Sequence, residues 1–265
     1  MNATPTLLLT GAAGLLGRTL HDPLRPLCAQ LILSDLPAAL QSAGLPSTAA
    51  CDLSDAAATD TLLQGVDTVV HFGGIAMEGP FEPILQANIR GMFNLYEAAR
   101  RAGTRRIVFA SSNHITGCYP QGQRITPDDP VRPDSNYGVS KLFGEGLARM
   151  YFDRYGIESV CLRLGTCTLT PPDRRSLATW ISPGDLVRLV CAAVTAPDVG
   201  FLIAYGVSAN PQRWWECDAA WAKLGFAPQD SAEPWASEIE GICPAPEDPC
   251  ARLQGGSFLG LGPFD

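Results

Sequence analysis

The sequence lacks an excess of positive charge. Its 265 residues carry 19 Lys and Arg against 27 Asp and Glu, which leaves a formal net charge of -8. Because a negative field repels phosphate, this balance opposes non-specific binding to nucleic acid or to an anionic membrane. A local cationic site can still hold one small anion. The composition therefore favours a small-molecule partner over a polyanion.

The sequence also lacks paired cysteines and long apolar segments. Its nine cysteines are scattered singly, with no CxxC pair and no Cys/His cluster at the spacing of zinc ligands. It contains no run of about 18 apolar residues, the length that crosses a bilayer. The opening MNATPTLLLT leads directly into a glycine motif instead of a secretory leader. We expect a cytoplasmic protein with reduced thiols and no metal site.

Hydrophobic residues make up 46% of the chain and charged residues 17%, and no polar low-complexity tract interrupts them. This balance is typical of a globular chain, and α/β chains of this length commonly form one domain, here 1–265. Short runs rich in Leu, Ile and Val alternate with segments of helical period, which predicts a doubly wound parallel α/β sheet, the Rossmann fold. The predicted strands are 6–10, 31–34, 68–72, 106–111, 159–164 and 201–205.

Helices are expected between these strands, at 14–24, 56–63, 83–102, 137–155, 184–196 and 215–224. The stretch 168–180, rich in Pro and Arg, breaks the alternation. We expect a small substrate-side lobe built mainly from 166–183 and 206–265. The tail from Cys243 onward is rich in Pro and Gly, which predicts an irregular segment packed over the surface.

A glycine-rich turn follows the first predicted strand and opens the first predicted helix. Its sequence, GAAGLLG, is a GxxGxxG pattern. Gly11 and Gly14 let the backbone bend tightly beside a pyrophosphate. The free N–H groups at the start of the helix stabilise the negative charge of that pyrophosphate. Gly17 allows close packing of helix on sheet, and Leu15 and Leu16 lie in the same turn. A plain glycine-rich turn is the alternative interpretation.

An acid stands at the end of the second predicted strand, where a dinucleotide site needs one. The Asp35 carboxylate can accept hydrogen bonds from the adenosine ribose and would repel a ribose 2′-phosphate. Because Leu36 rather than Arg follows, the sequence favours NAD over NADP. The alternative makes Asp35 a helix cap or a loop residue. Asp52, before Leu53, is predicted either to bond the adenine ring or to cap the following helix.

The third predicted strand ends in a glycine pair. Gly73 and Gly74 after Phe72 can let the backbone lie close to a cofactor, although a tight turn explains them equally well.

A tyrosine and a lysine stand four residues apart on one predicted helix. Tyr137 and Lys141 therefore share a helix face. Because a neighbouring cation favours a phenolate, Lys141 is expected to make Tyr137 a usable base near neutral pH. The fourth predicted strand delivers Ser112 to the carboxyl edge of the sheet, where α/β folds bind ligands. Its hydroxyl can hold the reacting oxygen beside the tyrosine.

GxxGxxG, Asp35, a serine at the end of a strand and YxxxK occur in this order over residues 6–165. In this order they resemble the short-chain dehydrogenase/reductase family, specifically its extended, sugar-nucleotide-modifying branch. The resemblance implies that Tyr137 is the catalytic base and that Lys141 binds the nicotinamide ribose. It also implies that Ser112 orients the substrate hydroxyl. Asn88, in a segment similar to a helix of this branch, is expected to be a structural hydrogen bonder.

Only about 100 residues follow the fifth predicted strand, too few for a lobe that holds a nucleoside diphosphate, so a free monosaccharide fits better. The segments GGIAMEGPFEPILQANIRG, RIVFASSNH, YGVSKLFGE, LARMYFDRYG, RLGTCT, LATW, WW and LQGGSF are similar to bacterial members of the branch that oxidise free hexuronic acids. The resemblance implies oxidation of D-galacturonate or D-glucuronate at C1 with NAD, which gives an aldarolactone and NADH.

The same resemblance assigns the substrate contacts. Arg175 stands at the position that binds the substrate carboxylate, and the adjacent Arg174 is the alternative. Ala76 stands where relatives carry a serine that touches the substrate, and Trp214–Trp215 is expected to be packing. The remaining expected contacts are Asn113 and His114 on sugar hydroxyls, Thr166 at a substrate-binding serine position and Cys167 beside the nicotinamide.

Two other functions stay open at this point. A sugar-nucleotide epimerase or dehydratase would use the same Tyr137 and Lys141 but would keep its NAD bound. A redox-sensing regulator would bind NAD without turning it over, and retention of Ser112 with the other two argues against it. The predicted helices 83–102 and 137–155 match the family's dimer contact, so a homo-oligomer is expected. The sequence does not rank galacturonate against glucuronate.

Overall fold

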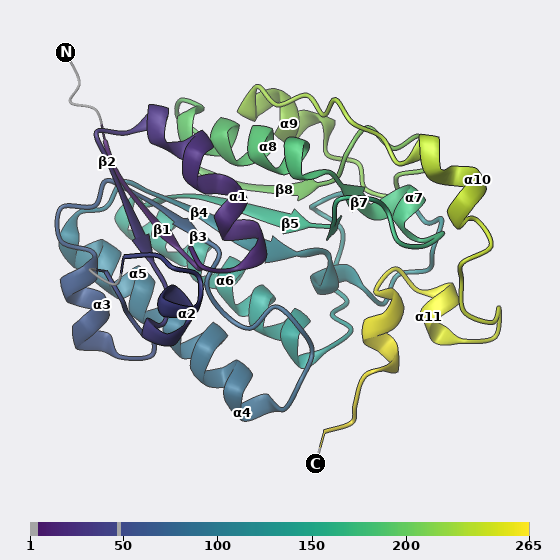
Figure 1. Cartoon of the computed structure of the whole chain (residues 1–265), viewed down its shortest axis with the longest axis horizontal. Coiled ribbons are helices and arrows are strands. Elements are labelled where there is room, and N and C mark those ends of the chain that lie inside the picture. The colour runs from purple at the N-terminus through teal and green to yellow at the C-terminus, as the bar shows by residue number, and fades with distance from the viewer. Residues whose placement is uncertain (1–4, 47–48, 265) are drawn as a thin grey trace.

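The computed structural model describes residues 5–46 and 49–264. Its centre is a six-stranded sheet in the order β2-β1-β3-β4-β5-β8, and every pairing in it is parallel (Figure 1). The doubly wound α/β prediction is therefore confirmed. The strands are β1 (Thr6–Thr10), β2 (Gln30–Ser34), β3 (Thr68–His71), β4 (Arg106–Ser112), β5 (Glu158–Leu164) and β8 (Phe201–Gly206).

The strand order creates a crevice between β1 and β3. From β1 the chain passes to β2 on one side and then returns to β3 on the other. The connections after these two strands leave in opposite directions, so a crevice opens at their carboxyl ends, where folds of this kind bind ligands. The glycine turn follows β1 and the glycine pair follows β3. Both predicted cofactor segments therefore meet at this crevice.

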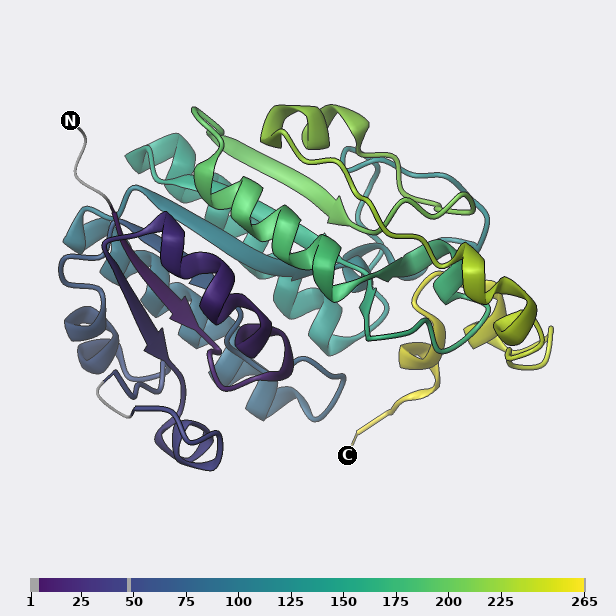
Figure 2. The same cartoon turned by 45° about the horizontal axis from the view of Figure 1, so that its top comes forward.

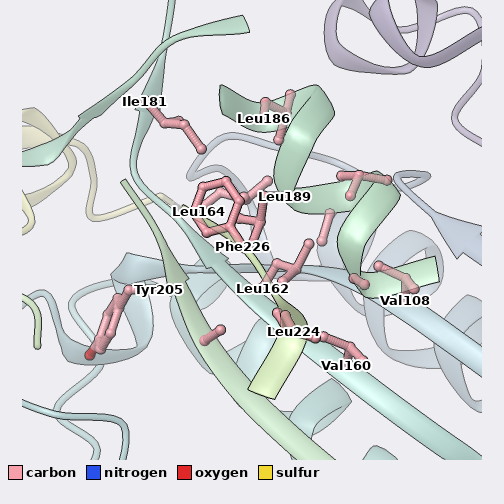
Figure 3. Close-up of a cluster of buried hydrophobic side chains, with 14 of the residues drawn as sticks. Val108, Val160, Leu162, Leu164, Ile181, Leu186, Leu189, Tyr205, Leu224 and Phe226 are labelled. Carbon is pink, nitrogen blue, oxygen red and sulfur yellow. The ribbon is translucent and has the colours of Figure 1, made fainter. Parts of the chain in front are cut away.

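Helices cover both faces of the sheet, and strand residues alternate between them. Figure 2 shows α1 (Leu15–Leu24) and α8 (Pro183–Thr195) over one face. On this face Leu186 and Leu189 of α8 pack over Val108, Val160 and Leu162 (Figure 3). The other face packs against α5 (Gly91–Ala102) and α6 (Asn136–Tyr155), and α3 (Ala56–Leu62) packs on α5. Burial on two faces explains why the strands read as continuous apolar runs.

Each predicted strand agrees with the structure to within one residue at either end. The predicted helix 83–102 is instead three segments: α4 (Phe81–Ile84), the π-helical η2 (Leu85–Arg90) and α5. The shortest elements were not predicted, because two to six residues carry too little periodicity. They are α2 (Pro37–Ser42), β6 (Thr166–Cys167), α7 (Ser176–Thr179), β7 (Trp180–Ile181), η1 (Arg25–Leu27), η3 (Asn113–Thr116) and η4 (Glu233–Trp235).

The C-terminal part agrees with the predicted surface segment except at 254–256, because its other described residues from Cys243 onward are exposed or partly exposed. It contains α9 (Asp218–Leu224), α10 (Ala236–Ile239), α11 (Pro249–Arg252) and η5 (Gly256–Gly260), and α11 lies near the carboxyl ends of the central strands (Figure 1). Gln254 within it is fully buried rather than packed over the surface. Its amide accepts from Trp215 Nε1 at 2.9 Å and donates to the carbonyl oxygens of Pro120 and Gln123. Because each polar atom is bonded, an irregular segment can be buried here.

Among the described residues no helix combines the length and the apolar character that a membrane crossing requires.

Candidate active site

The glycine turn after β1 leaves no room for side chains at two positions. Gly11 has a φ of +71°, and a Cβ there would lie 2.4 Å from the carbonyl carbon of Phe72. A Cβ on Gly17 would lie 2.0 Å from the carbonyl oxygen of Gly11. Gly14 is the N-cap of α1 and offers no side chain to the helix amides, so the N–H groups beside Leu15 and Leu16 are open to a ligand. This cradle fits a pyrophosphate.

Asp35 connects the second strand to the glycine turn. One carboxylate oxygen accepts from the Ala13 N–H at 2.9 Å and the other from the Leu36 N–H at 2.8 Å. Asp35 lies in the loop after β2 and is not a helix cap, because the N-cap of α2 is Leu36. Asp35 lines a pocket of about 250 Å³ together with Leu36, Asp52, Leu53, Gly73 and Gly74. The residues predicted for the adenosine half of NAD thus gather in one place.

We predict that Asp35→Asn will shift the preference from NAD toward NADP. The amide removes the charge that repels a 2′-phosphate but keeps the volume. NAD affinity should fall about tenfold and NADP affinity should rise by a similar factor, each equivalent to about 1.4 kcal/mol. Fluorescence titration with both dinucleotides measures the ratio, and Asp22→Asn on the exposed face of α1 is the matched control. An unchanged ratio would show that Asp35 acts only as a brace for the turn.

The loop between α2 and α3 is held by side chains that the sequence did not single out. The N-cap of α3 is Asp55, whose carboxylate accepts from the N–H groups of Ala57 and Ala58, so the capping alternative for Asp52 is wrong. Asp52 instead accepts from the Ser54 N–H at 2.9 Å. The Asn94 amide donates to the Leu53 and Ser54 carbonyl oxygens and fixes this side of the pocket.

The glycine pair after β3 forms a turn and also lets the Asn88 side chain lie close to the backbone. Gly74 has a φ of +117°, and a Cβ there would lie 2.6 Å from Asn88 Oδ1. The Asn88 amide binds both the N–H and the carbonyl of Ile75 and also donates to Ser140 Oγ at 2.9 Å. Asn88 thereby ties the loop after Phe72 and Gly73 to α6. This bonding agrees with the structural role expected for it.

The two serines at the end of β4 have different surroundings. Ser111 Oγ donates to the buried carboxylate of Glu145, which also forms a buried ion pair with Arg163 at 2.8 Å. Ser112 Oγ accepts from the His114 N–H at 3.2 Å and interacts with Tyr137, and no carboxylate binds it among the described residues. Ser112 is therefore the serine with a hydroxyl available to a substrate. The signal for the buried pair was an arginine inside the otherwise apolar segment of β5.

Tyr137 and Lys141 both lie buried in the first half of α6. Lys141 Nζ donates to the Ala110 carbonyl at 2.9 Å and lies 5.5 Å from the centre of the Tyr137 ring. Burial lowers the pKa of Lys141 to about 8. Burial also raises the pKa of Tyr137 to about 12, although a hydrogen bond with Ser112 acts in the opposite direction. In the protein alone desolvation is therefore the larger effect on Tyr137, and it opposes the activation that Lys141 was expected to provide.

The first turn of α6 is fixed by two residues that the sequence did not reveal. Ser135 is the N-cap, and its Oγ accepts from the Gly138 N–H at 3.0 Å. Glu78, on the loop after β3, accepts from the Tyr137 N–H at 2.8 Å. Ala76 lies exposed on the same loop. The backbone of Tyr137 is thus held from two sides.

We predict that Lys141→Met will stabilise the fold while it removes activity. The pKa of Lys141 is about 8 in the folded protein against its ordinary 10.5. The unfolded chain therefore binds this proton more tightly than the folded chain. This difference destabilises the fold fully below about pH 8, and the destabilisation decreases between pH 8 and pH 10.5. Methionine removes this destabilisation but also loses the hydrogen bond to the Ala110 carbonyl. The net increase in the free energy of unfolding should be about 2 kcal/mol at pH 7. Thermal unfolding at pH 7 and pH 10 measures this, and an equal shift at both values would contradict it.

Arg175 is a partly buried cation that has no ion-pair partner among the described residues. Its Nε donates to the Gln254 carbonyl at 2.6 Å, its Nη1 to Thr166 Oγ1 at 3.0 Å and its Nη2 to the Asn113 side-chain oxygen at 2.9 Å. No carboxylate lies within ion-pair distance of it among residues 5–46 and 49–264. Burial lowers its pKa to about 10, so it stays charged at neutral pH. Arg174, by contrast, is exposed.

The other predicted substrate residues lie around this cation and the tyrosine. Asn113 is buried, and its amide nitrogen donates to the Leu164 carbonyl at 2.8 Å. The His114 ring stands edge-on to the Tyr137 ring at 5.8 Å. Cys167 is half-buried, and burial raises the pKa of its thiol to about 12, so it is no nucleophile at neutral pH. Trp214 and Trp215 are buried, which confirms that they are packing residues.

Comparison with known proteins agrees with this geometry. The family model described as NAD dependent epimerase/dehydratase matches residues 7–174. The uronate dehydrogenase of Pseudomonas syringae pv. tomato is 48% identical over 260 residues, which are 97% of this chain and 94% of that protein.

Two solved structures are similar over nearly the whole chain. The glucuronic acid dehydrogenase of Chromohalobacter salexigens is 44% identical, with 97% of both chains covered and a TM-score of 0.89. A tyrosine-to-alanine mutant of the uronate dehydrogenase from Agrobacterium tumefaciens, solved in complex with NAD, is 46% identical, with 98% of both chains covered and the same TM-score.

Proposed function

The chain belongs to the NAD-dependent epimerase/dehydratase family, and from this premise we propose that it oxidises a free hexuronic acid at C1. It is an NAD-dependent oxidoreductase that acts on a CH–OH group. The substrate is D-galacturonate or D-glucuronate, and the products are the aldarolactone and NADH. The observation that carries this choice is the partly buried Arg175, which lies beside the tyrosine site and has no ion-pair partner among the residues that the structure describes.

The cradle around Gly11 and Gly17, the carboxylate of Asp35 and the loop at Gly73 would hold the dinucleotide. When bound, NAD accepts the hydride. Cys167 and Lys141 would lie at its nicotinamide half. The cradle supports this assignment because a Cβ at either glycine would overlap backbone atoms and close the space.

In this proposal Tyr137 removes the proton from the C1 hydroxyl while the C1–H bond breaks and its electron pair leaves as hydride. Ser112 holds the hydroxyl oxygen during the transfer. The ammonium of Lys141 lies 5.5 Å from the centre of the Tyr137 ring and stabilises the phenolate form of Tyr137, which accepts this proton and becomes the phenol. The oxygen and C1 then share a double bond, which is the carbonyl of the lactone.

Arg175 binds the substrate carboxylate in this proposal. A guanidinium has five N–H donors, and the protein partners of Arg175 leave an Nη2 donor and the full charge for a ligand. Desolvation makes a charge-assisted bond at this position stronger than on the surface. Asn113, His114 and Thr166 contact the sugar hydroxyls beside it. The segments 166–183 and 206–265 form this substrate side of a single domain.

The test is NADH absorbance after the protein is mixed with NAD and galacturonate, glucuronate or the corresponding neutral hexoses. We expect NADH only with the uronates. NADH absent with every sugar, from protein that binds NAD, would contradict the proposal. Conversion of a nucleotide sugar without free NADH would favour the epimerase function, and NAD binding without turnover would favour the sensor function.

We infer that the chain forms a homo-oligomer in the cytoplasm. Large apolar side chains are exposed on the long helices, with Phe93 on α5 at 47% exposure and Phe143 on α6 at 37%. Val139 on α6 adds to this face at 47% exposure. Covering such side chains favours self-association. Light scattering measures the state in solution, and a monomer at micromolar concentration would contradict the inference.

A further inference from the structure

His114 and Asp134 form a buried side-chain pair at the edge of the proposed sugar site. His114 Nδ1 lies 2.8 Å from Asp134 Oδ2, and the histidine as a whole is 8% exposed. The backbone reinforces the pair, because the Asp134 N–H donates to the His114 carbonyl at 3.3 Å. The aspartate side chain is fully buried. Its geometry toward the histidine is therefore fixed by the fold.

The space around the Asp134 carboxylate is made by two glycines from distant parts of the chain. A Cβ on Gly117 would lie 1.7 Å from Asp134 Oδ2, and a Cβ on Gly255 would lie 2.0 Å from the same oxygen. Asp134 Oδ1 accepts from Ser135 Oγ at 2.6 Å. The C-terminal segment around Gly255 thus closes over the carboxylate. A buried carboxylate needs donors, and the His114 ring is the donor that faces the site.

The second nitrogen of the histidine, Nε2, has no hydrogen-bond partner among the described residues, although the ring is nine-tenths buried. The ring stacks on Phe258 with 3.6 Å between centroids and stands edge-on to Tyr137 at 5.8 Å. One face of the ring and one of its nitrogens are therefore occupied by the protein. A ring held in this way has one polar atom left for a ligand.

We propose that Asp134 is a positioning residue that holds His114 as the Nδ1–H tautomer, so that Nε2 presents a lone pair to a hydroxyl of the sugar. The site then requires a hydrogen-bond donor from the substrate at this position. A neutral imidazole has one donor nitrogen and one acceptor nitrogen, and the partner of the first decides the role of the second. The identity of the sugar in this inference rests on the proposed function. The tautomer of the His114 ring does not depend on it.

The charged groups around the ring allow this neutral state. Asp134 and Glu78 favour the protonated ring, whereas Arg175 disfavours it. Burial has the largest effect and lowers the pKa of His114 below its ordinary value. The ring therefore stays neutral at pH 7, and Asp134 selects the tautomer instead of charging the ring. The competing state is an imidazolium, in which Nε2 would donate.

The first test needs no substrate. The protein contains three histidines, so nitrogen-15 spectra of histidine-labelled wild-type protein are simple, and His114→Gln identifies the His114 signals. At pH 7 we expect a protonated Nδ1 and a bare Nε2 for His114. An Nε2–H tautomer or an imidazolium at pH 7 would overturn the proposal. This measurement decides the matter even if the Asp134 variants fold poorly.

The second test uses deoxyfluoro uronates, because fluorine in place of a hydroxyl cannot donate. In the wild type, fluorine at the hydroxyl that His114 contacts should lower kcat/KM about tenfold or more, as expected for one lost bond of this kind. Asp134→Asn should raise KM for the natural uronate about 10- to 100-fold with kcat changed less than about threefold. In Asp134→Asn the fluorine penalty should disappear, while any chemical effect of fluorine acts equally on both proteins.

Asp129→Asn is the matched control, because Asp129 is hydrogen-bonded to Thr126 in a loop outside the site. It should keep the wild-type KM and the full fluorine penalty. The same penalty in Asp134→Asn as in the wild type would overturn the proposal. If no uronate gives NADH with the wild type, the proposed function fails instead, and the nitrogen-15 spectra still decide the tautomer.

Discussion

Tyr137→Phe will oxidise a uronate about 10³-fold more slowly than the wild type, with an unchanged affinity for NAD. Removal of a general base typically costs 10² to 10⁴ in rate. Phenylalanine has no atom that can take the proton, so we expect a loss near the middle of this range. The phenylalanine ring keeps the contacts with His114 and Phe258, so binding of the sugar should change little.

Single-turnover formation of NADH measures the loss. The matched control is Tyr155→Phe, the same change on the same helix at a ring that is 43% exposed, and it should keep the wild-type rate. A Tyr137→Phe rate within tenfold of the wild type would mean that a different group takes the proton. A lost affinity for NAD would instead indicate a damaged fold, which thermal unfolding would detect.

Arg175→Gln will lower kcat/KM for a uronate by about 10² to 10³ while affinity for NAD stays the same. Loss of one partner of a buried charge pair costs about 2–5 kcal/mol, because the substrate carboxylate is then desolvated without compensation. Glutamine can still bond to Thr166 or to the Gln254 carbonyl, so the fold should survive. Arg175→Lys should recover little, because an ammonium cannot reproduce the guanidinium contacts.

The ratio of rates with a uronate and with the matching neutral hexose separates recognition from general damage. In the wild type the ratio is expected to be large, and in Arg175→Gln it should fall toward one. Arg174→Gln is the control, since Arg174 is the exposed neighbour and its substitution should change kcat/KM less than about twofold. A large loss in the Arg174 variant would restore the alternative carboxylate ligand.

The elements that could be predicted from the sequence are those whose cause is local. At Gly11 a side chain would overlap backbone atoms, so the position requires glycine, and the residue type alone indicates a tight turn. Tyr137 and Lys141 share a helix face because of their spacing. The strand β4 is buried on two faces and reads as an apolar run. Such patterns are written in consecutive residues, so they predicted the fold and the order of the cofactor and catalytic residues.

Other properties depend on which distant residues are near, and no local pattern carries that information. The pKa of Tyr137 is raised because its ring is buried, and the degree of burial was not visible in the YxxxK motif. The tail was predicted to pack over the surface from its Pro and Gly content, and among its described residues only 254–256 are buried. Gln254 is buried because its amide finds partners more than 100 residues earlier in the chain, at Pro120 and Gln123.

The sequence by itself determined a doubly wound sheet with an NAD cradle, an acid for the ribose and a serine, tyrosine and lysine in catalytic order. Only the tertiary structure decided two further points. Arg175 has no carboxylate partner among the described residues, and Asp134 is closed between Gly117 and Gly255 beside His114. The physical reason is that charge compensation and desolvation depend on every group within a few ångströms, from all parts of the chain. The sequence specifies the residue types, whereas folding sets the distances between charged groups that are far apart in the chain.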